Sequence, residues 1–199
     1  MRKVFIDCGA WEGLSAKFFK ENHPYSKDFE IFSFECNPEA LSKLTDIDDI
    51  NIIDKAVWIT DDTIDFYLST KNAKEGSTLF KEKKTGAIDK EHPIRVKCIN
   101  FSKWITDNFN KDDFIIVKMN VEGAEYQIIR TMLKEGSLDY INKLYIQWHW
   151  KKIKYPEKKH KSLLSKIKNS NIELYPWPLD HDKNGEITGT WSKDFLRTL

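Results

Sequence analysis

The sequence predicts an α/β protein built on a doubly wound, mostly parallel sheet with helices on both faces and an antiparallel edge. Short apolar runs alternate with segments at helical spacing along most of the chain. Residues 114–119 form a continuous apolar run, which is typical of a central strand buried on both faces. The first 38 residues read as a strand, a glycine turn, a helix and a second strand that ends in an acid.

The N-terminal half supplies the first elements in order. Leu14 and Phe18 lie one helical turn apart, which favours a helix over 14–21. Pro38 suits a first helical turn, with Asn37 as the N-cap. The elements expected here are strands 3–8, 30–35 and 50–54, and helices 14–21 and 38–44. Residues 56–59 either continue the third strand or pair with 64–68, which alternates cleanly.

The second half begins with a long polar loop over 69–92, and loops of this length are usually functional or mobile. Beyond it we expect strands 94–99, 114–119, 144–149 and 172–175, helices 101–109 and 161–169, and a helix opened by 120–125. The turn signal at 182–185 predicts that the tail returns as a strand near 187–191.

The length and composition of the chain limit its expected domain count, partners and compartment. A length of 199 residues suits one domain, 1–199, in which about 150–199 form a C-terminal cap or complete the sheet. The net charge of +1 gives no global field for nucleic acid, and no apolar stretch is long enough to span a membrane. Three cysteines without paired spacing, and no recognisable leader, indicate a reducing, cytoplasmic compartment.

Polar residues follow the strands where a ligand would lie. In a doubly wound sheet, ligands bind beyond the carboxyl ends of the strands. Gly9 and Gly13 form a G-x-x-x-G turn, which lacks the third glycine that a pyrophosphate requires, and Glu35 can accept hydrogen bonds from a ribose diol. These residues predict an adenosyl cofactor without phosphates.

Four segments together carry a family resemblance: VFIDCGAWEG, FSFECNP, IIVKMNVEGAEYQII and LYIQWH. They resemble the FkbM-type class I methyltransferases, which have a Rossmann-like fold and use S-adenosyl-L-methionine. The resemblance implies that Gly9 to Gly13 wrap the methionine part, that Glu35 holds the ribose, that 54–57 flank the adenine, and that 77–79 form a lid. The implied cofactor-binding residues are Asp7, Gly9, Ala10, Gly13, Glu35, Asn37, Ala56 and Asn120.

Three residues are candidates for catalysis: Glu122, Glu125 and His149. An oxygen acceptor benefits from a base within hydrogen-bond reach. For the two glutamates the alternative is that they only complement the helix dipole. For His149 the alternatives are a metal ligand or a hydrogen-bonded structural histidine. Without HxH, HExxH or a cysteine set, we expect no dedicated metal site.

The function we expect is S-adenosylmethionine-dependent O-methylation of a saccharide or related polar acceptor, with no nucleic-acid or membrane partner and an oligomeric state that the sequence leaves open. Two departures from the family pattern, Asn120 for aspartate and Gln147 for glutamate, keep an alternative open: an impaired cofactor-binding or interaction protein. A nicotinamide dehydrogenase is disfavoured by the incomplete glycine pattern, and a nucleic-acid methyltransferase by the balanced charge.

Overall fold

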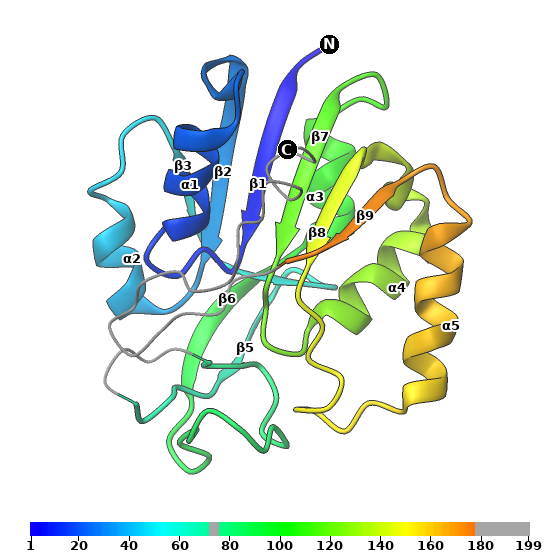
Figure 1. The fold of residues 1–199 in the computed structure, drawn as a ribbon. Coiled ribbons are helices and arrows are strands. Elements are labelled where there is room, and N and C mark those ends of the chain that lie inside the picture. Colours follow the sequence, from blue (N-terminus) through cyan, green and yellow to red (C-terminus); the bar gives the residue numbers. More distant parts are fainter. Residues whose placement is uncertain (72–75, 178–199) are drawn as a thin grey trace.

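The large sheet of the computed structural model has six strands in the order β3-β2-β1-β7-β8-β9, and every pair is parallel. The structure describes residues 1–71 and 76–177. The six strands are β1 (Lys3–Cys8), β2 (Phe29–Glu35), β3 (Asn51–Asp54), β7 (Phe114–Met119), β8 (Lys143–Ile146) and β9 (Glu173–Pro176). The chain runs outward from β1 in both directions, which confirms the doubly wound topology (Figure 1).

A second sheet has three strands in the order β4-β6-β5, formed by β4 (Ala56–Trp58), β5 (Asp62–Phe66) and β6 (Ile94–Asn100). Strand β4 pairs in parallel with β6, and β5 pairs antiparallel with the other edge of β6. Both alternatives predicted for residues 56–59 are therefore wrong. Figure 1 shows this small sheet at the carboxyl ends of the large-sheet strands.

Helices cover both faces of the large sheet. They are α1 (Leu14–Asn22), α2 (Pro38–Leu44), α3 (Phe101–Asn108), α4 (Glu125–Glu135) and α5 (Glu157–Lys168), with short 3-10 turns at Ser26–Asp28 and Ser137–Tyr140. Side chains alternate across β1: Val4 and Ile6 pack in the core that holds α3, α4 and α5, whereas Phe5 packs with Phe19 of α1.

The register brings three strand ends together at the centre of the sheet. Cys8 at the end of β1 lies opposite Phe34 of β2 and Met119 of β7. Because the strands are parallel, the residues that follow them leave the sheet at one edge. Glu35, Gly9 and Asn120 therefore start from neighbouring positions, and this edge carries the site.

The remaining expectations have mixed outcomes. Helix α5 begins at Glu157, four residues before the predicted start, and with β9 it extends the sheet beyond β8. The antiparallel pairing lies between β5 and β6, in the small sheet. The strand predicted near 187–191 lies outside the described residues. Among the described residues, none of the helices has the length and apolar character needed to cross a membrane.

Candidate functional site

A pocket opens at the carboxyl ends of β1, β2 and β7, where the sequence places its polar strand ends. Its walls come from the turn after β1, the end of β2, the start of β4 and the connection between β5 and β6. The residues that line it are Gly9, Ala10, Trp11, Leu14, Ser15, Phe34, Glu35, Cys36, Asn37, Lys55, Ala56, Val57, Phe66, Gly76, Ser77, Leu79, Lys118, Asn120, Val121 and Glu122.

The turn after β1 is held closely against β2 and β7. The backbone N–H groups of Gly9 and Ala10 both donate to the Phe34 carbonyl, at 3.0 and 2.9 Å. Gly9 has φ +76°, and a Cβ at this position would lie 2.1 Å from the carbonyl oxygen of Asn120. Only glycine allows the end of β7 to approach so closely. Gly9 therefore sets the floor of the pocket.

Two of the predicted cofactor residues lie outside the lining. Gly13 caps α1 with φ +78°, and a Cβ there would lie 2.1 Å from Ile47 and 2.8 Å from Leu44, so its small size serves packing. Asp7 is fully buried beneath the turn. Direct cofactor contacts by Asp7 and Gly13 remain predictions, and the structure gives both residues supporting positions.

Glu35 occupies the pocket with its carboxylate held by backbone amides. Its Oε1 accepts the N–H groups of Cys36 and Asn37, each at 2.8 Å, and its Oε2 accepts that of Trp11 at 2.7 Å. Burial raises the pKa of Glu35, while these amides oppose the rise. A carboxylate oxygen has two lone pairs, so the hydrogen bonds of the described residues leave one acceptor position, on Oε2.

Lys118 is a buried cation that the sequence analysis did not select. It is the last but one residue of the apolar strand β7 and is 2% exposed. Its Nζ lies 2.8 Å from Asp7 Oδ1 and donates to the Gly9 carbonyl at 2.8 Å. Burial raises the pKa of Asp7, and Lys118 opposes this by stabilising the carboxylate. A lysine inside an otherwise apolar strand must meet an anion, and this was an available signal.

Asn120 follows β7 and presents an unsatisfied acceptor. Its backbone N–H donates to the Cys8 carbonyl at 3.0 Å, which anchors the residue beside the glycine turn. Its Oδ1 is buried and, within the described part of the chain, has no hydrogen-bond partner. A buried polar atom without a partner is costly. Because Asn120 also lines the pocket, its side chain is suited to a donor group on a ligand.

Glu122, Glu125 and His149 form one buried cluster beside Asn120. His149 Nδ1 lies 2.7 Å from Glu125 Oε1, and His149 Nε2 lies 3.4 Å from Glu122 Oε1. Glu125 is fully buried in the first turn of α4, where its carboxylate also accepts the backbone N–H groups of Val121 and Gly123 at 3.1 and 3.0 Å. The fold thus joins the three catalytic candidates through His149, which contacts both carboxylates.

Neighbouring charges shift the pKa values of His149 and Glu122 in this cluster. Burial lowers the pKa of His149, but the two carboxylates outweigh this effect and raise the value to about 9. The two carboxylates therefore favour the imidazolium form of His149. Burial raises the pKa of Glu122, but His149, Lys83 and Lys152 more than offset this and hold the value well below its usual range. Glu122 is a firmly ionised, weakly basic carboxylate.

Of the three catalytic candidates, Glu122 is the one that lines the pocket. Its backbone has φ +51°, an unfavourable conformation for a residue with a side chain, which recurs at functional sites. Glu125 and His149 lie behind it. His149 faces the Glu122 carboxylate, and Glu125 holds His149 from its other ring nitrogen, so direct contact with a substrate is not the role that the positions of Glu125 and His149 indicate.

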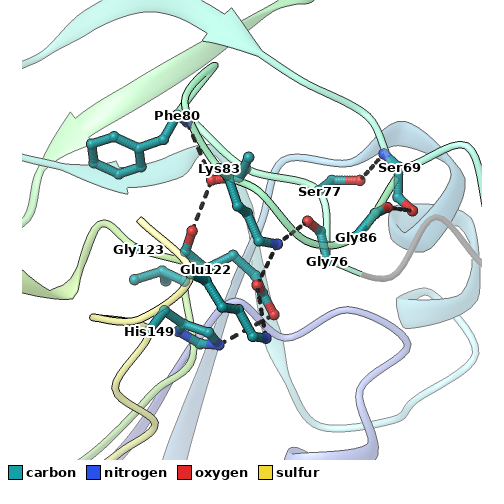
Figure 2. Close-up of polar contacts among 12 residues, drawn as sticks. Ser69, Gly76, Ser77, Phe80, Lys83, Gly86, Glu122, Gly123 and His149 are labelled. Atoms are coloured by element: carbon teal, nitrogen blue, oxygen red, sulfur yellow. Dashed lines mark hydrogen bonds and ion pairs between the residues drawn. The ribbon is translucent and has the colours of Figure 1, made fainter. Parts of the chain in front are cut away.

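The connection between β5 and β6 supplies the fourth wall, and it contains residues 77–79, to which the family resemblance assigns a lid. Thr78 pairs with Tyr67 through two backbone hydrogen bonds of 2.8 and 3.0 Å, and its Oγ1 donates to the Glu122 carbonyl at 2.8 Å. Gly76, Ser77 and Leu79 face the pocket. Figure 2 shows Lys83 of this connection reaching Glu122, a contact without a sequence signal.

Other predictions concern metals, cysteines and aromatic rings. Among the described residues, no group of three or more His, Cys, Asp or Glu could hold a metal ion. The three cysteines are free and buried, where they act as small apolar residues. Trp177, directly after β9, is buried, and Trp150 stacks on His160, so both rings contribute to packing.

The fold and the strand-end pocket define a Rossmann-like α/β protein of the class I type. The family model described as "Methyltransferase FkbM domain" matches residues 7–172, so the chain belongs to the FkbM methyltransferase family. A crystal structure of methyltransferase FkbM from Methylobacillus flagellatus KT superimposes with a TM-score of 0.49 at 16% identity, covering 84% of this chain and 38% of that one. Comparison with curated proteins gives no match.

Proposed function

We propose that the protein is an S-adenosyl-L-methionine-dependent methyltransferase that acts on a hydroxyl group of a saccharide or related polar acceptor. The observation that carries the proposal is a pair of open acceptors in one pocket: the remaining position on Glu35 Oε2 and the unpartnered Oδ1 of Asn120. Glu35 ends β2 and Asn120 follows β7, and these two strands flank β1 on opposite sides. An adenosyl amino acid carries hydroxyl donors on its ribose and an ammonium donor on its amino-acid part.

The residues present fit this cofactor. Glu35 would accept one ribose hydroxyl, because three backbone amides already occupy its other acceptor positions. Ala56 and Val57 offer an apolar wall for the adenine, next to Cys36. Asn120 would accept a hydrogen bond from the ammonium group of the methionine part. The bound cofactor would supply an electrophilic methyl group on a sulfonium.

Glu122 is the residue we assign to the acceptor. Its carboxylate lines the pocket and is held in place by three cations, so it can accept the hydrogen bond of a hydroxyl and orient the oxygen for in-line attack. Its lowered pKa makes it a weak base. Glu122 would therefore chiefly orient the acceptor hydroxyl and would take up its proton late.

The first test is calorimetric titration with S-adenosylmethionine, S-adenosylhomocysteine and NAD, using wild type, Glu35→Gln and Glu21→Gln. We expect the adenosyl pair to bind and NAD not to bind. Glu35→Gln should weaken binding about tenfold, because an amide replaces a charged acceptor and cannot accept all the backbone hydrogen bonds. Glu21 is exposed on α1, so its variant should match wild type. Tighter binding of NAD would refute the assignment.

One observation, the amide at position 120, favours a second candidate function. Asn120 stands where the family pattern has an acid, so the chain can hold the cofactor and still lack turnover. An impaired cofactor-binding protein predicts adenosyl binding without methyl transfer to any saccharide in an acceptor panel. Turnover gained by Asn120→Asp, with unchanged folding, would identify this case.

A further inference from the structure

Lys83 is buried, although the charged residues on either side of it are exposed. Its side chain is 1% exposed, whereas Lys81, Glu82 and Lys84 beside it are exposed. Burial lowers the pKa of Lys83, and Glu122 opposes this effect. A lysine is rarely buried without a paired anion, because removing the charge from water is expensive. The groups around the Lys83 ammonium therefore indicate the role of this lysine.

The connection between β5 and β6 is folded around this ammonium group. Lys83 Nζ donates to the carbonyl oxygen of Gly76, and it lies 2.5 Å from Glu122 Oε2 (Figure 2). A Cβ at Gly76 or at Gly86 would lie 3.3 Å from the same nitrogen. Two backbone segments thus enclose the ammonium group, and the third side is the pocket carboxylate.

Further contacts tie the same segment to the residues after β7 and β8. Thr78 Oγ1 donates to the Glu122 carbonyl at 2.8 Å, and the Lys84 N–H donates to the Lys152 carbonyl at 3.1 Å. These bonds involve the backbone. Lys83 supplies the one charged contact of the described segment that reaches the Glu122 side chain, and it does so from the opposite side to His149.

We propose that Lys83 is a positioning residue that latches the lid, residues 76–86, onto Glu122 and fixes the carboxylate in the pocket. The latch makes the lid wall and the acceptor-facing carboxylate a single unit, so neither moves without the other. The consequence for catalysis rests on the proposed function, whereas the latch itself concerns the protein without ligand. Lys152, half-buried and 3.5 Å from the same carboxylate, is too distant to replace Lys83 fully.

The experiment is hydrogen exchange, followed by mass spectrometry, on ligand-free wild type, Lys83→Met, Glu122→Gln, the double variant and Lys81→Met. Methionine preserves the length and packing of the lysine stem without its charge. We expect peptides from 76–86 to exchange at least about tenfold faster in both single variants, with β1 and β7 unchanged, because the local opening has lost its ion pair. The double variant should add little to the larger single effect, and Lys81→Met should match wild type.

Two outcomes would overturn the latch: exchange of 76–86 unchanged in Lys83→Met, or additive effects of the two substitutions. A general rise in exchange that includes the large sheet would show a role in folding only. Stopped-flow dissociation of S-adenosylmethionine supplies the functional arm, where Lys83→Met should release the cofactor about tenfold faster. Absence of any adenosyl binding would refute the proposed function and leave the exchange result to decide the latch.

Discussion

The two ends of the pocket hold their carboxylates by different means. At the β2 end, three backbone amides from residues near in sequence or in the adjoining turn hold Glu35. At the β7 end, side chains hold Glu122: Lys83 from the lid and His149 and Lys152 from beyond β8. One end is fixed by backbone geometry and the other by charges drawn from distant segments.

This difference separates the parts of the site that tolerate change from those that do not. Among the standard residues, only proline lacks a backbone N–H, so the donors at the β2 end survive most substitutions, and this end is vulnerable at Glu35 itself and where the chain path is altered. The β7 end depends on a balance of two buried carboxylates against buried cations, and removing one partner leaves an unpaired charge. Substitutions at the two ends should therefore fail in different ways.

The largest effect should come from breaking the chain path at the glycine turn. In Gly9→Ala, the new Cβ would lie 2.1 Å from the Asn120 carbonyl at a left-handed backbone position. We expect adenosyl binding to be lost and the free energy of unfolding to fall by more than about 2 kcal/mol, because strain and steric overlap add.

Gly136→Ala is the matched control. Gly136 has φ +78°, yet a Cβ there would meet nothing within 4 Å. In Gly136→Ala, the free energy of unfolding should fall by only about 1 kcal/mol, because backbone strain is added without steric overlap, and binding should stay intact. Urea unfolding and calorimetry measure both quantities. Equal losses in the two variants would mean that conformational strain, and not the contact with Asn120, decides the result.

The next effect concerns the charge balance at the other end. The folded-state pKa of His149 is raised to about 9, above the ordinary value of about 6.5, so the folded protein keeps a proton that the unfolded chain releases. The stability from this imidazolium is complete below pH 6.5 and is lost as pH rises towards 9. The full loss is roughly 3 kcal/mol.

Urea unfolding of wild type and His149→Gln at several values between pH 6 and pH 9.5 measures this contribution. The difference between the two proteins should shrink steadily as pH rises. His92→Gln, on the exposed connection before β6, provides a control that should follow wild type. A difference that stays constant across the range would show that His149 is neutral in the folded protein.

The smallest effect should come from Asn120, which lines the β7 end of the pocket. Asn120→Asp converts the unpartnered amide oxygen into a charged acceptor beside the cofactor pocket. We expect affinity for S-adenosylmethionine to rise five- to tenfold, which corresponds to about 1 kcal/mol, because charge-assisted hydrogen bonds to an ammonium are the stronger ones. Calorimetry measures it, with Asn120→Ala expected to bind more weakly than wild type. Weaker binding by the aspartate variant would remove Asn120 from the ammonium site.

The same difference explains how far the sequence could predict the structure. Glu35 and Asn120 follow strands whose apolar runs are evident, so parallel pairing alone brings them to one edge. The small sheet was mispredicted because β4 pairs with β6, some forty residues further on, and alternation within a strand does not reveal its partner.

Individual residues show where local patterns end. The predicted ligand contact of Gly13 stays a prediction, and the structure adds a packing reason for a glycine there, because Leu44 and Ile47 from about thirty residues away leave no room for a Cβ. Lys118 had a signal, as a charge within an apolar strand. Lys83 had none, since a run of charged residues gives no indication of which one tertiary contacts will bury.

The small sheet also defines a replaceable part of the molecule. The connection that forms the lid leaves from β5 and returns through β6, and the antiparallel ladder between Phe66 and Ile94 fixes both points of attachment. The entropy of closing such a loop grows only slowly with its length, so the anchored ends tolerate insertions and exchanges. Under the proposed function, exchange of this connection would change the lid wall of the pocket while the large sheet is left unchanged.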